Sequence, residues 1–323
     1  MIPDISLIIP FLNEQENISR LVAELNTYLA TWQAVRVEVL FVDDGSTDYS
    51  VAFLKNAPHQ AYTAKIVKLS KNYGSHAALR AGILHATGQR ITFLPADLQD
   101  PLALLGQLHA KSLEGYDIVW AARKTVAVSF FERMFSKAYA ELMRTFAVSN
   151  YPANGFDVVM FNEKVKQALN QNIEANSSVF LQILTLGFRC ASISYDKHAR
   201  SLGQSKWTFS KKIKLLLDSF VAFSYAPIRF VSIMGILFSL IGFLWTAYLI
   251  GRTLLAGNVA PGWPALISIL FLGFGVTNIG LGIVAEYLWR TLDAARKRPV
   301  FLVDEIIALG APSEASKESG GPI

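Results

Sequence analysis

The chain has 323 residues, of which 52% are hydrophobic and 17% are charged, and its formal net charge is +5. This length allows one large domain or two smaller ones around a substantial core. The composition is too apolar for a simple soluble enzyme. The single cysteine, Cys190, excludes an internal disulfide and favours a reducing compartment.

The first two hundred or so residues alternate between strand and helix patterns. Residues 5–9 predict a strand, and residues 14–28 predict a helix with its apolar side chains on one stripe. Asn13, with Glu16 three residues later, is the expected cap of that helix. This alternation indicates an α/β fold with a mostly parallel sheet and helices on both faces. The pattern continues with strands at 37–42, 66–69, 91–94 and 117–122 and helices at 49–56 and 76–86.

Acidic residues follow two of these expected strands. Asp43 and Asp44 end the strand at 37–42, and Asp97 comes shortly after the strand at 91–94. Ligands of open parallel sheets bind outside the carboxyl ends of the strands, so these acids predict a ligand site. The structural alternatives are that Asp44 holds the amides of its own glycine turn and that Asp97 caps the helix after Pro101.

Two apolar stretches, residues 230–250 and 263–285, each have the length of about 20 residues that a helix needs to cross a bilayer. Two buried helices of a soluble core are the alternative. Lysines and arginines precede the first stretch and follow the second, and only Arg252 lies between them, so both ends should be cytoplasmic. Met1 leads directly into the first strand without a basic segment, which also keeps the soluble part in the cytoplasm. Positive charge near the spans favours anionic lipid headgroups over nucleic acid.

The ordered motifs of the chain carry a resemblance to a known family. They read IIPFLNEQENI, VEVLFVDDGSTD, LSKNYGSHAALRAGILHATGQ, LPADLQDP and RSLGQSKW, with the two apolar stretches after them. Together they resemble the polyisoprenyl-phosphate glycosyltransferases, which are family 2 glycosyltransferases of GT-A fold, over roughly residues 5–298.

The resemblance implies four parts. They are a cytoplasmic catalytic domain over 1–205, an amphipathic juxtamembrane segment over 206–229, two transmembrane helices within 230–289 and a cytoplasmic tail over 290–323. Packing of the segment 206–229 against the catalytic domain is the alternative to its lying on the membrane.

For the donor, the resemblance implies that Pro10, Glu14, Asp43 and Asp44 surround the nucleotide and that Arg123 approaches its phosphates. The alternatives are a first-turn acid favoured by the helix dipole for Glu14 and a surface cation for Arg123.

Asp97 and Gln99 correspond to ligands of the family's metal motif, and Asp97 is also a catalytic candidate. Their oxygen atoms suit Mg²⁺ or Mn²⁺ on the donor diphosphate. The family commonly has Asp-Ala-Asp, whereas this chain has Pro95-Ala96-Asp97, so one expected ligand is missing.

For the acceptor, the resemblance implies that Asp157 lies near the lipid phosphate as catalytic base or sugar ligand. Arg200, Ser205 and Lys206 are expected to bind the phosphate of the donor or of the lipid. A turn acid and solvated surface charges are the alternatives.

The resemblance implies an inverting transferase that moves a sugar from a nucleotide sugar to undecaprenyl phosphate at the cytoplasmic face of the membrane. Glucose from UDP-glucose is the first expectation, because glucosyl transfer to this lipid is frequent among bacterial members of the family. The lipid-linked sugar would serve cell-envelope glycosylation, for example of lipopolysaccharide. GDP-mannose, UDP-N-acetylhexosamine and UDP-aminoarabinose are alternative donors. The rival functions are those of a polysaccharide synthase and of a catalytically degenerate membrane protein that binds a nucleotide sugar. The expected partners are the nucleotide sugar, the lipid, the membrane and further copies of the chain in a homo-oligomer, without nucleic acid.

Overall fold

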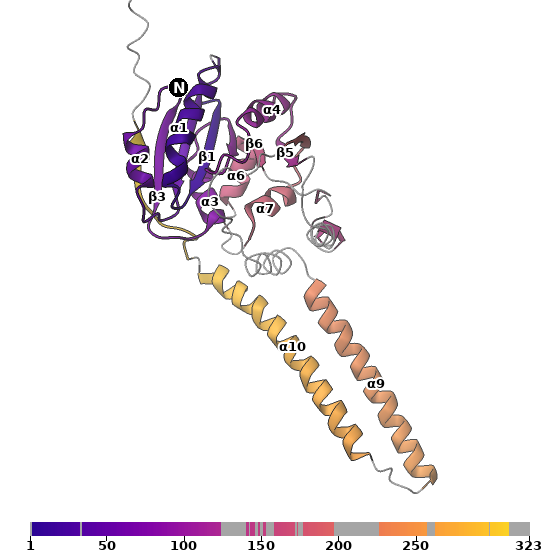
Figure 1. Cartoon of the computed structure of the whole chain (residues 1–323). Coiled ribbons are helices and arrows are strands. Elements are labelled where there is room, and N and C mark those ends of the chain that lie inside the picture. The colour runs from indigo at the N-terminus through magenta and orange to yellow at the C-terminus, as the bar shows by residue number, and fades with distance from the viewer. Residues whose placement is uncertain are drawn as a thin grey trace, which may run out of the picture. The chain divides into compact units, whose positions relative to one another are not determined.

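The computed structural model describes residues 2–32, 34–123, 140–141, 143–145, 148, 151–152, 158–171, 173, 177–196, 226–256, 262–296 and 298–309. The chain divides into two compact units (Figure 1). The first contains Met1–Leu216 together with Pro299–Ile323, and the second contains Leu217–Arg298.

The first unit is built on a sheet with the strand order β7-β5-β6-β4-β1-β2-β3-β8. β1 pairs in parallel with β2 and β4, β2 with β3, and β5 with β7, whereas β6 and β8 pair with their neighbours in antiparallel fashion. The expected mostly parallel sheet is therefore confirmed. The strands are β1 (Ile5–Phe11), β2 (Val37–Asp43), β3 (Thr63–Leu69), β4 (Arg90–Phe93), β5 (Ile118–Arg123), β6 (Val158–Asn162), β7 (Cys190–Tyr195) and β8 (Val303–Leu309).

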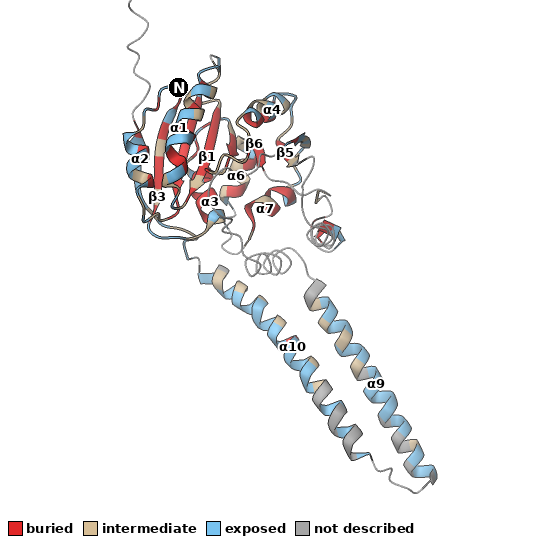
Figure 2. Cartoon of the chain, in the orientation of Figure 1, coloured by how far each residue is buried: buried red, intermediate tan, exposed pale blue. Residues whose placement is uncertain are grey.

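Helices cover both faces of the sheet, as expected. On one face α1 (Gln15–Leu29), α2 (Ser50–Asn56) and α4 (Ala103–Ser112) join a buried core with alternate strand residues such as Leu7 and Val39. Successive strand residues point to opposite faces. Ile8 accordingly meets α3 (Ser75–His85) on the other face, which also carries α6 (Glu163–Gln171) and α7 (Val179–Thr185). Figure 2 shows the central strands buried between these layers.

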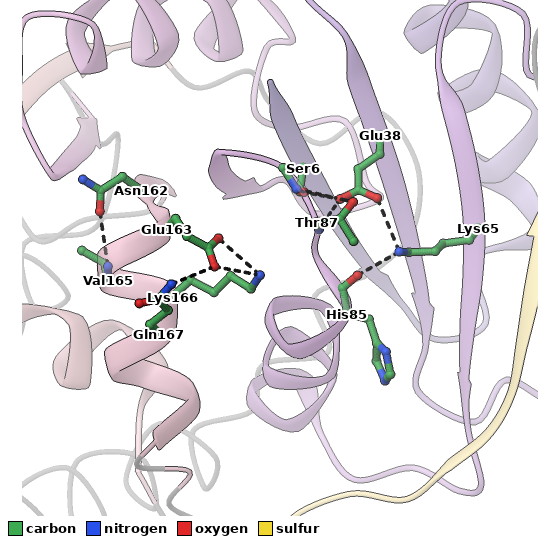
Figure 3. A network of polar contacts seen from close by, with 11 residues as sticks. Ser6, Glu38, Lys65, His85, Thr87, Asn162, Glu163, Val165, Lys166 and Gln167 are labelled. Carbon is green, nitrogen blue, oxygen red and sulfur yellow. Dashed lines mark hydrogen bonds and ion pairs between the residues drawn. The ribbon is translucent and has the colours of Figure 1, made fainter. Parts of the chain in front are cut away.

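A buried ionic network holds the amino-terminal edge of the sheet together. Glu38 is 6% exposed, accepts hydrogen bonds from the Ser6 hydroxyl and the Thr87 amide and hydroxyl, and pairs with Lys65 at 3.4 Å (Figure 3). Lys65 also donates to the His85 carbonyl oxygen at 2.8 Å. Burial alone would raise the pKa of Glu38, but the hydrogen bonds and the Lys65 charge outweigh it and hold the pKa below its ordinary value.

β8 is an element that the sequence did not lead us to expect, since it lies within the predicted tail 290–323. It pairs with β3 from Ala64 opposite Leu309 to Leu69 opposite Val303. Most of its side chains are at least partly exposed, and only Leu309 is buried. Exposed charged residues at the edge of a sheet give a sequence pattern that is hard to tell from a polar tail.

The second unit contains α9 (Ala226–Ala256) and α10 (Trp263–Arg296), so both expected apolar stretches are helical. The two helices are in contact: a Cβ on Gly280 of α10 would lie 2.9 Å from Cγ1 of Val231 of α9. Within the described part of the chain, one stretch, Ile228–Trp245, is long and apolar enough to span a membrane, and 0% of it is buried. Figure 2 shows the described parts of both helices as largely exposed.

Candidate active site

The loops that carry most of the predicted site residues leave the sheet at one edge. Phe11 of β1 lies opposite Asp43 of β2, and Asp43 lies opposite Lys68 of β3. β4 runs parallel to β1 and ends at Phe93, so the loop with Asp97 starts at the same edge. The structure therefore brings together the carboxyl ends of four parallel strands, where a ligand of such a sheet binds.

Asp43 and Asp44 hold two different loops. Asp43 is fully buried, and its Oδ1 accepts the Ser46 amide of its own turn at 2.8 Å. Asp44 instead accepts the amides of Tyr73, at 2.8 Å, and Gly74, at 3.0 Å, both from the loop between β3 and α3. The structural alternative for Asp44 was therefore wrong about the partner, because Asp43 holds the glycine turn.

The carboxylates of Asp43 and Asp44 are only partly compensated by hydrogen-bond donors. Burial raises the pKa of the Asp44 carboxyl, the neighbouring Asp43 adds to the shift, and the amides of Tyr73 and Gly74 partly offset it. Oδ2 of Asp43 is buried and has no hydrogen-bond partner among the described residues. A buried acceptor without a donor is costly.

Asn13 does not cap the first helix as expected. The side-chain Oδ1 of Asn13 accepts the backbone amide of Thr47 at 2.8 Å, and the backbone amide of Asn13 donates to the Ser46 hydroxyl at 3.0 Å. The side chain therefore joins the loop after β1 to the loop after β2. Its φ of 52° lies in the left-handed region, which asparagine tolerates better than most residues. α1 begins at Gln15, and Glu14 at its N-cap makes no side-chain capping bond.

Glu14 lies at the N-cap of α1 at this edge, where its carboxylate accepts the Asn17 side-chain amide at 2.7 Å. Its amide donates to the Ser50 hydroxyl at 2.9 Å. Glu14 therefore stands one residue before the first turn of the expected alternative, and its contact with a nucleotide stays a prediction.

Pro10 is tolerated inside β1 because of where β4 stops. The Phe11 carbonyl oxygen faces β2 and accepts the Asp44 amide at 3.0 Å, while the Ile8 carbonyl oxygen faces the other neighbour and accepts the Leu94 amide at 3.1 Å. By alternation, Pro10 faces the β4 side beyond the last paired residue, so its missing N–H removes no ladder bond. It therefore lies at the same edge of the sheet as Asp43 and Asp44.

Asp97 and Gln99 lie in the loop that follows β4, which we call the acid loop (residues 95–101). Oδ1 of Asp97 accepts the Gln99 amide at 3.2 Å, and the intervening Leu98 has a left-handed φ of 55°. α4 starts at Ala103 with Leu102 at its N-cap, so the alternative of Asp97 as the cap of this helix is wrong.

The donor set of the acid loop fits a cation that arrives with substrate. Among the described residues, no three His, Cys, Asp or Glu side chains gather as a metal site. Asp97 and Gln99 offer oxygen atoms from a single loop, and Mg²⁺ is commonly held by one or two carboxylates together with substrate phosphates and water.

Several predicted site residues cannot be placed in this geometry. Asp157, Arg200, Ser205 and Lys206 lie outside the described residues, as do positions 206–225 of the expected juxtamembrane segment. The backbone of Arg123 ends β5, where it lies opposite Tyr195 of β7.

Two further features of this edge had no signal in the sequence. One is the pair of amides, Tyr73 and Gly74, that Asp44 holds. The other is a hydrogen bond from the Tyr195 hydroxyl to Oδ1 of Asp100, across 95 positions of the chain. Their partners are distant in sequence, so only the assembled sheet reveals them.

Carboxylates at the carboxyl edge of a mostly parallel sheet, one of them with a buried acceptor oxygen, define an α/β protein with a candidate ligand site at that edge. The profile of Glycosyl transferase family 2 matches residues 6–190. The chain belongs to this family and is a glycosyltransferase, and the resemblance seen in its sequence is confirmed.

Two relatives match nearly the whole chain. An uncharacterized glycosyltransferase of Synechocystis is 33% identical over 308 residues, which are 95% of this chain and 96% of the relative. The undecaprenyl-phosphate 4-deoxy-4-formamido-L-arabinose transferase of Klebsiella pneumoniae is 31% identical over 320 residues, 97% of this chain and 96% of the relative. A solved structure of glucosyl-3-phosphoglycerate synthase from Mycobacterium tuberculosis with Mg²⁺ and UDP is 18% identical and covers 67% of this chain and 78% of that one. Its TM-score of 0.45 is too low to support any statement about the site.

Proposed function

We propose that this protein transfers a sugar from a nucleotide sugar to polyprenyl phosphate at the cytoplasmic face of a membrane. One observation carries the proposal: the similarity to the K. pneumoniae transferase extends over 97% of the chain. It therefore includes the apolar helices α9 and α10 as well as the catalytic sheet. The name of that relative specifies undecaprenyl phosphate as its acceptor.

Two donors are proposed. UDP-glucose is the donor first expected from the sequence. A nucleotide-linked derivative of 4-amino-4-deoxy-arabinose is the second, and the name of the K. pneumoniae relative favours it.

The chemistry is a single displacement. A lone pair on a phosphate oxygen of the lipid forms the new bond to the anomeric carbon, and the bond from that carbon to the donor diphosphate breaks. The electron pair of the broken bond leaves with the nucleoside diphosphate. Attack from the face opposite the leaving group inverts the configuration. A phosphate monoester is largely ionised near neutral pH, so it needs little help from a base. Asp157 would then serve mainly to orient the sugar or the acceptor.

Each residue at the carboxyl edge of the sheet has its own proposed role in binding the donor. Asp43 would accept a hydrogen bond from the base or the ribose through its buried Oδ2, and Asp44 holds the neighbouring loop in place. Asp97 and Gln99 would hold a divalent cation, which supplies charge neutralisation on the diphosphate when bound. Arg123 at the end of β5 would approach the donor phosphates, and Arg200 and Lys206 would add the phosphate contacts that forked and point-charge donors provide.

Chain connectivity supports a two-span topology. β8 follows α10 in the chain, yet it pairs with β3 in the sheet that precedes α9. Both flanks of the helical unit thus belong to one compact unit. If α9 crosses a bilayer, α10 must bring the chain back. This agrees with the positive residues on both flanks. A reporter in the loop 257–261 should read external and one at the C-terminus cytoplasmic. Finding both on one side would rule out this topology.

The activity test uses the full-length protein, undecaprenyl phosphate and a panel of radiolabelled nucleotide sugars that includes both proposed donors. Label should enter an organic-extractable lipid, and the Asp97→Asn variant, with the same fold, should lose nearly all of this transfer. Label in a polymer would indicate a polysaccharide synthase. Binding of nucleotide sugar without transfer from any donor would refute the proposed function.

A further inference from the structure

One buried hydrogen bond joins the end of β7 to the loop after β4, two segments that lie far apart in the sheet. The Tyr195 hydroxyl donates to Oδ1 of Asp100, and the two residues are 3% and 4% exposed. Tyr195 is the last residue of β7, whereas Asp100 lies in the acid loop after β4, and β5 and β6 lie between these strands. Neighbouring strands are about 4.8 Å apart, so the bond links chain segments whose strands are roughly 14 Å apart.

On the β4 side, the bond holds a short loop whose conformation is fixed by an internal hydrogen bond. Asp100 follows Asp97 by three positions, Oδ1 of Asp97 accepts the Gln99 amide, and Leu98 is held in a left-handed conformation. A displacement of Asp100 would therefore pass directly to the oxygen atoms of Asp97 and Gln99. These are the atoms assigned above to the cation on the diphosphate.

On the β7 side, the bond starts from a fixed point, because Tyr195 is the last residue of a strand that pairs with β5 as far as Arg123. The sheet therefore anchors the residue that donates the bond.

We propose that Asp100 and Tyr195 are positioning residues that hold the acid loop in register with the end of β7, so that Asp97 and Gln99 present their oxygen atoms in one arrangement to the cation on the diphosphate. The inference rests on the proposed function, which assigns the cation to these two residues. Misplacement by about 1 Å is enough to cost roughly a hundredfold in rate, so a bond that sets this register matters for catalysis.

The ring of Tyr195 has a separate, structural role, because it belongs to the main apolar core with Leu94 and Leu104. Tyr195→Phe keeps that packing and removes only the hydroxyl. A matched control is Tyr62→Phe. Tyr62 is also a core tyrosine, 2% exposed, and its hydroxyl is hydrogen-bonded to His59 Nδ1 at 3.1 Å. It directly precedes β3 and so lies at the opposite edge of the sheet from the acids.

The test measures four quantities on the full-length protein: kcat, the KM for the nucleotide sugar, the Mn²⁺ concentration for half-maximal transfer, and the melting temperature. Tyr195→Phe should lower kcat/KM about tenfold or more and raise the Mn²⁺ requirement several-fold. Tyr62→Phe should lower the melting temperature to a similar extent and leave kinetics and Mn²⁺ requirement near wild type. Equal kinetic behaviour of the two variants would overturn the inference.

Two variants of Asp100 give an independent answer if Tyr195→Phe melts below the assay temperature. Asp100→Asn keeps an oxygen that can accept the tyrosine hydroxyl, whereas Asp100→Ala removes it. The alanine variant should need several-fold more Mn²⁺ than the asparagine variant, and equal requirements would overturn the inference.

A binding measurement separates this inference from the proposed function. Calorimetry gives the affinity for UDP or GDP, whichever the wild-type protein binds, with and without Mn²⁺. Even if no donor is transferred to lipid, Tyr195→Phe should weaken the Mn²⁺-dependent part of this affinity several-fold, and Tyr62→Phe should not. Unchanged affinity in Tyr195→Phe would refute the positioning role, while absent transfer by the wild type would refute only the proposed function.

Discussion

Gly45 links the acids of the site to the loop after β3, and its replacement by alanine tests how tightly the two are packed. Its φ is +79°, and a Cβ at this position would lie 2.6 Å from both the Asn72 amide nitrogen and the Lys71 carbonyl carbon. These are backbone atoms, so they cannot rotate away. The loop at 71–74, which donates the Tyr73 and Gly74 amides to Asp44, would have to shift.

The expected cost of Gly45→Ala has two parts. A left-handed backbone costs a non-glycine residue about 1–2 kcal/mol, and forcing extra atoms into a packed site costs about 1–3 kcal/mol more. Gly187 provides a matched control, because its φ is +71° and a Cβ there would meet nothing within 4 Å. Gly187→Ala should therefore cost only the first part.

The assay compares melting temperatures of the two variants and the hydrogen exchange of the Tyr73 and Gly74 amides. For a unit of this size, 1 kcal/mol corresponds to roughly 2–4 °C, so Gly45→Ala should melt several degrees below Gly187→Ala. Its two loop amides should also exchange faster, and its nucleotide affinity should fall. Equal melting temperatures and unchanged exchange would refute the view that the glycine turn seats this loop.

Three further predictions concern charged groups. Glu38→Gln should destabilise the protein by about 1–3 kcal/mol at pH 7. The folded pKa of Glu38 lies below its ordinary value of 4.5, so the stability that this carboxylate contributes is present above pH 4.5 and is lost as pH falls through the folded pKa. The melting temperatures of the wild type and Glu38→Gln should therefore converge in acid. The folded pKa of Asp44 is raised, so ionisation of its carboxyl lowers stability as pH rises. Asp44→Asn removes this charge but sets an amide donor against the loop amides that Asp44 accepts, so the Tyr73 and Gly74 amides should exchange faster and calorimetry should show weaker nucleotide binding. Pro95→Asp should lower the Mg²⁺ concentration for half-maximal transfer about tenfold by adding a carboxylate near Asp97, and an unchanged titration would contradict the metal assignment.

The parts of the fold that the sequence predicted are those encoded by local patterns. The buried strands β1 and β2 are continuous apolar runs, and the stripe of Ile18, Leu21 and Leu25 predicts α1. The acids stand out because Asp43 and Asp44 interrupt such a run at its end. A periodic signal within ten or fifteen residues is sufficient for these predictions.

The parts that were missed depend on contacts between distant segments. Asn13 looks like a helix cap in the sequence, yet Ser46 and Thr47, more than thirty positions away, compete successfully for its polar groups. The roles of Asp43 and Asp44 likewise depend on which loop amides the assembled sheet presents to each carboxylate. Local sequence shows which polar side chains can bind backbone amides, but the tertiary structure determines which amides they bind.

β8 adds a constraint on topology that is independent of the charge distribution. The count of lysines and arginines is a statistical preference. The pairing of β8 with β3 is a constraint of chain connectivity. A single crossing would place the two strands on opposite sides of a bilayer and abolish the ladder from Ala64–Leu309 to Leu69–Val303. The exposed Lys68–Asp304 pair, at 2.7 Å, contributes little to this ladder, since surface ion pairs are typically worth at most about 1 kcal/mol. If the helices cross a bilayer as proposed, the backbone hydrogen bonds between β3 and β8 therefore allow only an even number of crossings, and a single span would have to unfold this edge of the sheet.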